Sequence, residues 1–569
     1  MNIEDYKCAV FDIESKGWIH FVVIALYDGK TYQVFTSLKA FLSEISKKKY
    51  RGYVFYAHNG GKFDFLFLLE DIFNKSSWKT GVWEKNGGIL ALTIENQTTK
   101  FTIADSYAIL AQSQLKLSQS FNVKHSKVAF DFEKEVVSIR NKKLMKRLEF
   151  DCKGLYEIIG KFFSSDYIIN PKLTIGSQAL DTYIHKFSTF TPVRLNIKHE
   201  EAIRENFYSG GRVEVYKGYG KNIHCYDVNS LFPFVMLNEM PVGECVRTKQ
   251  YKKGLIGFYC VEIKSTPDWY ISPLLVKGSK NFFVNGKGEY FFSSAMLEYL
   301  KSEFGIRCNV KWGFVFKSKE YIFNDYVEHF YNLKRNAKDG VERWIAKYML
   351  NTLYGKLGQD RNRQRIERYN GQAHFQILEN EYALRYGLVL VDMQSKSKYI
   401  CPYIAAYITE LARLHHYKLM MQNPQNMFYC DTDSLYTSAT YKTGSEIGEL
   451  SSLGTFEGVF LSPKTYALRN EKETIIHFKG FNSENFSFEQ FKTMLVSNSA
   501  VPLTQTHERI LSYRECMTRV NGIKDEAGDF LKLVESTKRA SFDYDKRKVI
   551  PDRKAIFETQ PFTFQEVCQ

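Results

Sequence analysis

The chain has 569 residues, of which 44% are hydrophobic, so it is long enough to form several domains with substantial cores. Its formal net charge of +15 favours a polyanionic partner, because cations displace counterions from phosphates. The sequence predicts no membrane span, since no apolar run approaches bilayer length, and its first residues do not resemble a secretory leader. The ten cysteines form no CxxC pair, so we expect a reducing compartment and neither a zinc site nor a redox motif.

Apolar strands alternate with helices over the first third of the chain, which indicates an α/β domain. Strands are predicted at 7–15, 18–29, 31–36 and 53–59, and helices at 37–48 and 144–163. The polar segment 164–177 follows and is the first predicted domain boundary.

The rest of the chain is mixed, and it opens with the β-rich segment FYSGGRVEVYKGYG. Residues 245–320 read mainly as strands and turns, and helices are predicted at Val341–Tyr354 and 405–421. The segment 426–438, NMFYCDTDSLYTS, predicts a hairpin with the CDTD turn between two short strands. No elements are predicted after Gly480, where the tail is mixed and charged.

Four carboxylates stand out in the first third of the chain. Asp12 and Glu14 alternate along a strand, so both side chains leave the same face, while Asp64 and Asp151 come from separate segments. Such a set can hold two hard divalent cations, one activating water and one stabilising the leaving oxygen, as in phosphodiester hydrolysis. Each acid alone is more typical of a solvated surface charge, but Asp12 follows AVF in an apolar strand, where a carboxylate needs a cation or hydrogen bonds.

Three further acids lie at predicted strand ends. Asp227 precedes VNSLFP, whose proline closes a turn, and Asp431 and Asp433 alternate in the CDTD turn. Asp227 and Asp433 are predicted to clamp two Mg²⁺ ions, with Mn²⁺ as an alternative ion.

A predicted helix between these acids carries Lys347, Asn351 and Tyr354 at i, i+4 and i+7, so the three share one face. That face offers a cation for a triphosphate, an amide, and an aromatic ring for a nascent base pair. Alone, such a stripe is more often a mixed amphipathic surface, but here it stands in order between the two acidic motifs.

In this order and spacing, the motifs around Asp227, Lys347–Gly355 and Asp431–Asp433 resemble motifs A, B and C of family B DNA polymerases. The N-terminal acids resemble the proofreading exonuclease of the same family, and the resemblance covers nearly the whole chain. It implies an α/β and α+β multidomain fold, with an RNase H-like 3′–5′ exonuclease domain and a palm–fingers–thumb polymerase domain with inserted subdomains. The catalytic residues that it implies are Asp12, Glu14, Asp64, Asp151, Asp227, Asp431 and Asp433. Its metal ligands are the same acids except Asp431, which supports them, together with the Val228 carbonyl.

The exonuclease resemblance also implies contacts to single-stranded DNA. His58-Asn59…Phe63-Asp64 matches the second exonuclease motif with an extra Gly in its loop. The segment DSYAILAQSQLKLSQSF resembles a single-strand contact motif, in which Ser113, Leu115 and Phe121 hold the 3′ end, although core packing is as typical of the two apolar residues.

One position departs from the family. A Tyr usually stands four residues before Asp151, and this chain has Arg147 there. Either the attacking water is held differently, or the register of the third exonuclease motif differs.

The polymerase resemblance places further residues at the nucleotide. Phe232 replaces the usual Tyr, and its ring is expected under the sugar, where it excludes a 2′-hydroxyl. Lys347 is expected to contact the triphosphate, and Asn351 and Tyr354 lie on the same helix face. A second upstream cation is either Lys334 or Arg335, and the sequence does not choose between them.

Three weaker motifs narrow the resemblance to protein-primed polymerases of the phage and linear-plasmid type. They imply primer and template contacts by Tyr208, Gly210 and Gly211, by Thr409 and Arg413, and by Lys464 and Tyr466. Singly each motif is weak, since Gly-Gly is usually a turn. Asp12 also lies close to the first residue, which suggests that the long N-terminal domain of cellular relatives is missing.

The resemblance implies the following boundaries: an exonuclease domain at 1–175 and a polymerase domain at 176–569, with palm at about 190–250 and 425–480, an inserted terminal-protein region at about 251–325, fingers at about 330–420 with a second insertion at about 359–398, and a thumb at about 481–569. The first insertion would contact the priming protein. The second would close a ring around DNA and so support processivity and strand displacement.

The predicted partners are template and primer DNA, dNTPs, a terminal protein and a single-strand-binding protein, in the cytoplasm of a phage- or plasmid-bearing host cell. An ordinary DNA-primed family B polymerase is the main alternative. A stand-alone nuclease would leave motifs A, B and C unexplained. A reverse transcriptase would not bring the exonuclease acids, and a non-catalytic DNA-binding protein would need none of them.

Overall fold

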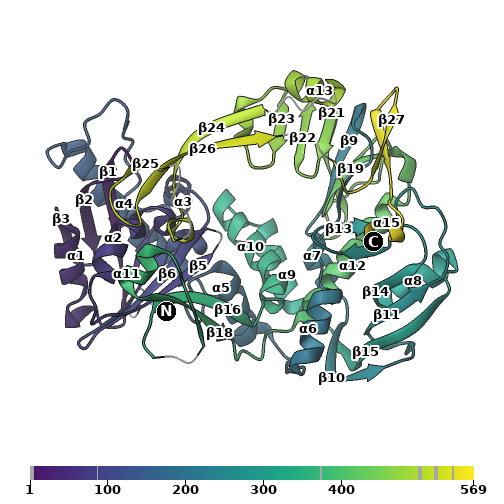
Figure 1. Ribbon diagram of the computed structural model, residues 1–569, viewed down its shortest axis with the longest axis horizontal. Coiled ribbons are helices and arrows are strands. Elements are labelled where there is room, and N and C mark those ends of the chain that lie inside the picture. Colours follow the sequence, from purple (N-terminus) through teal and green to yellow (C-terminus); the bar gives the residue numbers. More distant parts are fainter. Residues whose placement is uncertain are drawn as a thin grey trace.

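The computed structural model describes residues 6–85, 87–371, 374–497, 503–517, 523–540 and 544–568. Two large sheets dominate it, one centred on the N-terminal α/β domain and one formed by strands between residues 213 and 478, with helices between them (Figure 1).

The N-terminal domain is built on β1–β7 with α1, α2, α3 and α4. Their bounds are β1 Cys8–Lys16, β2 His20–Tyr27, β3 Tyr32–Phe35, β4 Val54–Ala57, β5 Lys79–Lys85, β6 Gly88–Glu95, β7 Lys100–Asp105, α1 Leu38–Ile45, α2 Asp64–Phe73, α3 Gln114–Ser120 and α4 Lys142–Phe163. β1 is buried on both faces, which is typical of an apolar strand in the middle of a sheet, and it runs parallel to β4. α4 packs against it through Leu148, Cys152 and Leu155, at i, i+4 and i+7. The predicted strands and helices of this region are confirmed.

The second large sheet has the order β23-β22-β21-β9-β20-β19-β8. Its strands are β8 Val213–Val215, β9 Tyr219–Val228, β19 Met427–Asp431, β20 Ser434–Thr437, β21 Leu450–Ser462, β22 Thr465–Arg469 and β23 Thr474–Phe478. The predicted CDTD hairpin is β19–β20, and Ser434 of β20 pairs with Asp227 of β9. The sequence-distant acids are therefore brought to one edge by strand pairing.

The helices of the polymerase-like half are α5 Ile175–Thr182, α6 Ile197–Asn206, α7 Leu231–Met236, α9 Asn324–Arg335, α10 Gly340–Leu357, α12 Pro402–Met420 and α13 Phe488–Ser497. α10 and α12 confirm the two predicted helices of this half. Asp339 caps the first turn of α10 by accepting from Val341 and Glu342 N–H.

The first inserted region forms a four-stranded sheet, a two-stranded sheet and a helix. It comprises β10 Met240–Thr248, β11 Gly257–Ile263, β12 Leu275–Lys277, β13 Asn281–Phe283, β14 Gly288–Ser293, α8 Ser294–Phe304 and β15 Cys308–Glu320. α8 corrects the prediction of strands and turns over 245–320. Its Met296, Leu297 and Leu300 are buried on one side, and it ends at Gly305, whose φ of +62° suits a helix C-terminus.

The second inserted region extends the sheet of the N-terminal domain. It contains β16 Asn362–Arg368, β17 Phe375–Ile377, α11 Glu381–Tyr386 and β18 Leu388–Gln394. β16 pairs with β5, with Ile366 opposite Val82, so one ten-stranded sheet runs through both regions.

The residues predicted as a thumb divide into two parts. The first is an arch of β24 Leu503–Ile510, α14 Tyr513–Cys516, β25 Ile523–Glu526 and β26 Lys532–Ala540, which crosses the top of Figure 1 toward the N-terminal domain. There Tyr513 and Phe530 pack against Phe73 of α2. The second part, β27 Lys548–Asp552, β28 Ile556–Gln560 and α15 Phe564–Cys568, returns to the seven-stranded sheet, where Thr559 N–H donates to the Tyr216 carbonyl.

Candidate functional site

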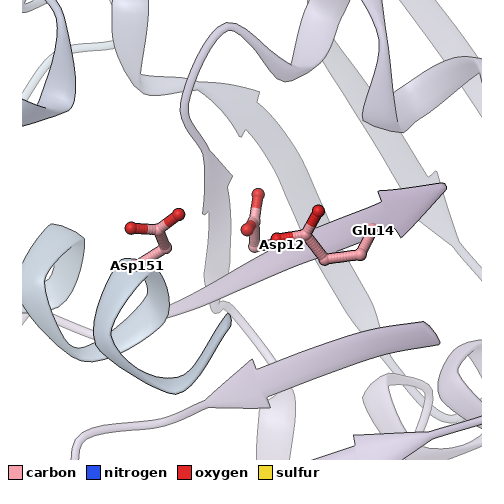
Figure 2. A group of neighbouring side chains, drawn as sticks. All are labelled: Asp12, Glu14 and Asp151. Atoms are coloured by element: carbon pink, nitrogen blue, oxygen red, sulfur yellow. The ribbon is translucent and has the colours of Figure 1, made fainter. Parts of the chain in front are cut away.

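Three of the four predicted N-terminal acids meet in space. Ligand oxygens of Asp12, Glu14 and Asp151 all lie within 4.8 Å of one another. Figure 2 shows Asp12 and Glu14 leaving one face of β1 and Asp151 approaching from α4. Asp64 lies close by at the start of α2 but outside this group, and its Oδ1 accepts the Ile13 N–H at 3.0 Å.

The acids of this group are held at an electrostatic cost. Burial, with repulsion from Asp64 next, raises the pKa of Asp12 well above its usual range. Burial is also the main reason why the pKa values of Glu14 and Asp64 rise to about 7. The buried Oδ1 of Asp151 has no hydrogen-bond partner among the described residues. An all-oxygen group with such an orphan acceptor fits a hard divalent cation such as Mg²⁺ or Mn²⁺.

Two cationic side chains also enter this group. Arg147 Nε lies 3.3 Å from Glu14 Oε1 and 3.5 Å from Asp151 Oδ2, and Lys127 Nζ lies 3.1 Å from Asp151 Oδ2. Arg147 therefore stands on α4 at the position predicted from sequence, one turn before Asp151. Sequence reasoning missed Lys127, which lies in a segment without periodic pattern and so gave no local signal.

The predicted DNA contacts next to these acids have mixed environments. Both ring nitrogens of His58 form hydrogen bonds within the protein: Nδ1 with Ser106 Oγ at 3.0 Å and Nε2 with the Gln112 carbonyl at 2.8 Å. Asn59 is exposed with a φ of +61°, and Phe63 is half-buried, edge-on to the exposed ring of Trp18. Asn59 and Phe63 are thus accessible to a ligand, whereas the hydrogen bonds of His58 hold its segment to Ser106 and Gln112.

In the second predicted motif, Ser113 caps α3 by accepting from Lys116 N–H. Leu115 is exposed and Phe121 is half-buried against the core, so Leu115 is the more accessible of the two.

The second group of acids lies at one end of the seven-stranded sheet. Asp227 is the last residue but one of β9, and the carbonyl of Asp433 accepts the Val228 N–H at 2.9 Å. Burial, with repulsion from Asp227 next, raises the pKa of Asp433 to about 7, and burial raises that of Asp227. Asp431 is instead held by Lys464, whose Nζ donates to both of its oxygens at 3.0 and 3.1 Å.

The predicted nucleotide-contacting residues border these acids. The Tyr354 ring stacks on Phe232 with centroids 4.5 Å apart, and Lys347 is exposed on the same helix. Lys334 Nζ donates to Ser230 Oγ at 2.8 Å, and its charge opposes the rise in the Asp227 pKa. Arg335 points to Glu446 at 3.6 Å.

Geometry thus favours Lys334 as the second cation. Arg343 was missed by sequence reasoning, although it stands one turn before Lys347 on α10; its charge lowers the pKa of Lys334, next to burial.

Two of the three predicted priming motifs contact each other, and buried side chains occur in the second and third. Thr409 and Arg413 are buried, and Arg413 Nη1 donates to the Ser209 and Gly210 carbonyls at 2.5 and 3.0 Å. Tyr466 is also buried, with its hydroxyl 3.2 Å from that of Tyr436. In this arrangement Arg413 of α12 secures the loop after Tyr208, and direct DNA contact by Thr409 and Arg413 stays a prediction.

A cleft of about 890 Å³ lies between the N-terminal domain and α10. Tyr354 lines it together with the cations Lys85, Lys172, Lys356 and Arg363. Burial, with the charges of Arg363 and Lys85, lowers the pKa of Lys356 to about 8.

Among the described residues, no helix combines the length and apolarity that crossing a bilayer requires.

Comparisons with known proteins agree with this picture. A family model described as DNA polymerase type B, organellar and viral, matches residues 45–148 and 139–442. Probable DNA polymerases of Podospora anserina and Neurospora intermedia are each 26% identical, over 92% and 85% of this chain, which spans 54% and 60% of their lengths. The DNA-directed DNA polymerase of Enterobacteria phage PRD1 is 26% identical, over 76% of each chain.

Among solved structures, Phi29 DNA polymerase complexed with primer-template DNA and incoming nucleotide substrates matches with a TM-score of 0.72. The match has 17% identity and covers 95% of this chain and 100% of that one. It confirms the predicted fold class.

In metal-free buffer, the clustered carboxylates should make the fold less stable as the pH rises. A carboxyl group whose pKa is raised in the folded state stabilises the fold at low pH. It loses that contribution as the pH rises through its folded-state pKa, which is about 7 for Glu14, Asp64 and Asp433. We expect the melting temperature in EDTA to fall from about pH 5.5 to about pH 8, and excess Mg²⁺ to restore it, because the ion binds the folded chain.

The control is the double variant Glu14→Gln, Asp433→Asn, in which this fall should be smaller by about 2–4 °C. Identical slopes in variant and parent, or no shift with Mg²⁺, would contradict the prediction.

Proposed function

The chain belongs to the organellar and viral family of type B DNA polymerases, and we propose that it is a template-directed DNA polymerase with a 3′–5′ exonuclease that starts synthesis on a terminal protein. The observation that carries the polymerase assignment is the meeting of Asp227 and Asp433 beside the stacked rings of Phe232 and Tyr354. We also propose that the protein acts in the cytoplasm of a host cell.

At the polymerase site, Asp227, Asp433 and the Val228 carbonyl would hold two divalent ions. When bound, these ions supply charge neutralisation at the triphosphate and activation of the attacking hydroxyl. Lys334 and Lys347 bind the triphosphate. The Phe232 ring lies under the sugar and leaves no room for a 2′-hydroxyl.

At the exonuclease site, Asp12, Glu14, Asp64 and Asp151 would hold the ions that hydrolysis needs. The proximity of three of these acids and the orphan oxygen of Asp151 support this role. Asn59, Phe63 and Ser113 are proposed to position the 3′ end.

Protein priming rests on the family and on the region between Asp227 and Lys347. The described part of that region contains a folded insertion, in which a four-stranded sheet and α8 lie beside α12. A terminal protein docked there would present a hydroxyl at the α-phosphate in place of a primer 3′-OH. An ordinary DNA-primed enzyme remains the alternative.

Removing either polymerase acid tests the main assignment. Asp227→Ala or Asp433→Ala should reduce dNTP incorporation on a primed template by about 10³-fold or more, because each holds the ions that neutralise the triphosphate. Degradation of single-stranded DNA should stay within about twofold, since the other acids serve it. Normal synthesis by either variant would refute the polymerase site, and wild-type hydrolysis without synthesis would favour the nuclease alternative.

The exonuclease site is tested by Arg147→Tyr. The Arg147 guanidinium pairs with Glu14 and Asp151, so its loss should favour cation binding. We expect single-strand degradation at limiting Mg²⁺ to rise by about tenfold, equivalent to about one pKa unit of charge interaction. Asp12→Ala with Asp64→Ala should abolish it.

The matched control for Arg147→Tyr is Lys146→Tyr, which changes an exposed neighbour on α4. Unchanged or lower degradation in Arg147→Tyr, with Lys146→Tyr like the parent, would refute an inhibitory role for Arg147.

Protein priming is tested by charge reversal on the loop between β10 and β11. Deleting 252–316 would expose the core, because Phe316 stacks on Tyr403 with centroids 4.8 Å apart. The exposed Lys249, Lys252 and Lys253 can be changed to Glu without touching that core. We expect transfer of dNMP to the terminal protein to fall by about tenfold, and extension of primed DNA by less than about threefold.

The control reverses three exposed lysines of the N-terminal domain, Lys30, Lys39 and Lys48. Equal loss of both activities would argue against docking at this loop. Efficient extension with no adduct on any candidate protein would favour the DNA-primed alternative.

A further inference from the structure

A buried ionic network lies beside the turn that carries Asp431 and Asp433. Glu214 is 1% exposed and Arg212 is 2% exposed, and Arg212 Nε donates to Glu214 Oε2 at 2.7 Å. The same oxygen accepts from Tyr216 Oη at 3.1 Å and lies 3.7 Å from Nη1 of Arg547, which is also buried. One buried carboxylate is therefore the counter-charge of two buried guanidinium groups.

The backbone of Arg212 supports the catalytic turn directly. Its carbonyl accepts the N–H of Thr432 at 2.7 Å. Thr432 has a φ of +63°, which is strained for a β-branched residue, so the turn keeps its shape only if its surroundings impose it. Gly211 completes the support, because a Cβ there would lie 2.7 Å from Thr432 Cγ2.

The strand that provides this support needs anchoring of its own. β8 has only three residues and lies at the edge of the seven-stranded sheet, where Glu214 pairs with Cys430 of β19. Nη1 of Arg212 also donates to the Ser272 carbonyl at 2.8 Å. The side chains of Arg212 and Glu214 thus fix a strand that its own ladder holds weakly.

The C-terminal segment closes the network from the other side. Arg547 Nε donates to Thr559 Oγ1 at 2.7 Å, and its Nη2 donates to the Tyr270 carbonyl at 2.7 Å. Thr559 Oγ1 in turn donates to the Val215 carbonyl at 2.8 Å. β8 is therefore held between β19 and a segment more than three hundred residues later in the chain.

We propose that Glu214 is a positioning residue for nucleotide incorporation: as the shared buried counter-charge of Arg212 and Arg547, it fixes the Arg212 carbonyl that shapes the Asp431–Asp433 turn. This role rests on the polymerase function proposed above. Glutamine at this position would keep the shape of the side chain and leave two buried cations without a counter-charge. Their repulsion would displace β8 and, through the Thr432 N–H, the turn that carries Asp433.

The test compares Glu214→Gln, Glu214→Asp and the control Glu200→Gln in the full-length chain. Glu200 forms a similarly buried ion pair with Arg361, 2.7 Å long, away from the turn. For Glu214→Gln we expect kcat for incorporation to fall by about tenfold or more, KM for dNTP to stay within about threefold, and the Mg²⁺ requirement to rise. Glu214→Asp keeps the charge and should recover most of kcat.

Degradation of single-stranded DNA by the same preparations reports whether the chain is folded, and it should be unchanged in Glu214→Gln. Arg547→Lys serves as a second variant if Glu214→Gln does not fold, and it should lower kcat by about two- to threefold with the same Mg²⁺ effect. Wild-type kcat and Mg²⁺ dependence in the folded variants would overturn the proposal. So would a parallel loss of synthesis and degradation that Glu200→Gln reproduces, because that pattern indicates a general structural role. A wild-type chain that makes no DNA would instead refute the polymerase function itself.

Discussion

Carboxylates that converge in a partly buried site repel one another, and the backbone has to hold them together against that repulsion. Both halves of this chain do so with regular structure. Asp12 and Glu14 share a face of β1, opposite Asp151 on α4, and strand pairing brings Asp227 beside the β19–β20 turn. The raised pKa values of these acids show that the arrangement does not serve stability. A bound cation would relieve the repulsion, which agrees with the metal sites proposed above.

The two groups of acids differ in the cations that the protein itself supplies. In the first group, Lys127 and Arg147 reach the carboxylates directly. In the second, Lys464 pairs with Asp431, while Lys334 and Lys347 act on Asp227 from a greater distance. Asp227 and Asp433 are therefore left open for ions, whereas ions at the first group would compete with two side chains. Arg147 stands where the family resemblance predicts a Tyr, and this competition is the physical consequence of that difference.

Local pattern was sufficient to predict several of the elements that carry the chemistry, but not α2, which carries Asp64, or α9, which carries Lys334. β1, α4, α10 and the β19–β20 hairpin have short-range signals, either alternation, helical periodicity or a turn between apolar strands. α8 was missed because its buried residues lie inside a strand-rich region. Motif resemblance gave positions but not side-chain directions: Arg413 and His58 point inward, toward partners that only the fold brings near. The network of Glu214 with Arg547 joins segments too far apart in sequence for any local signal.

The spacing between the two sites follows from elements outside both of them. β16 extends the exonuclease sheet by pairing with β5, and Arg368 Nη1 donates to the Lys75 carbonyl at 3.0 Å. The arch packs on the same core, where Tyr386 Oη donates to Asp529 at 2.7 Å. Swinging the N-terminal domain away would break strand pairing and expose apolar surface shared by three parts of the chain. These contacts favour a rigid frame that keeps the two groups of acids at a fixed separation.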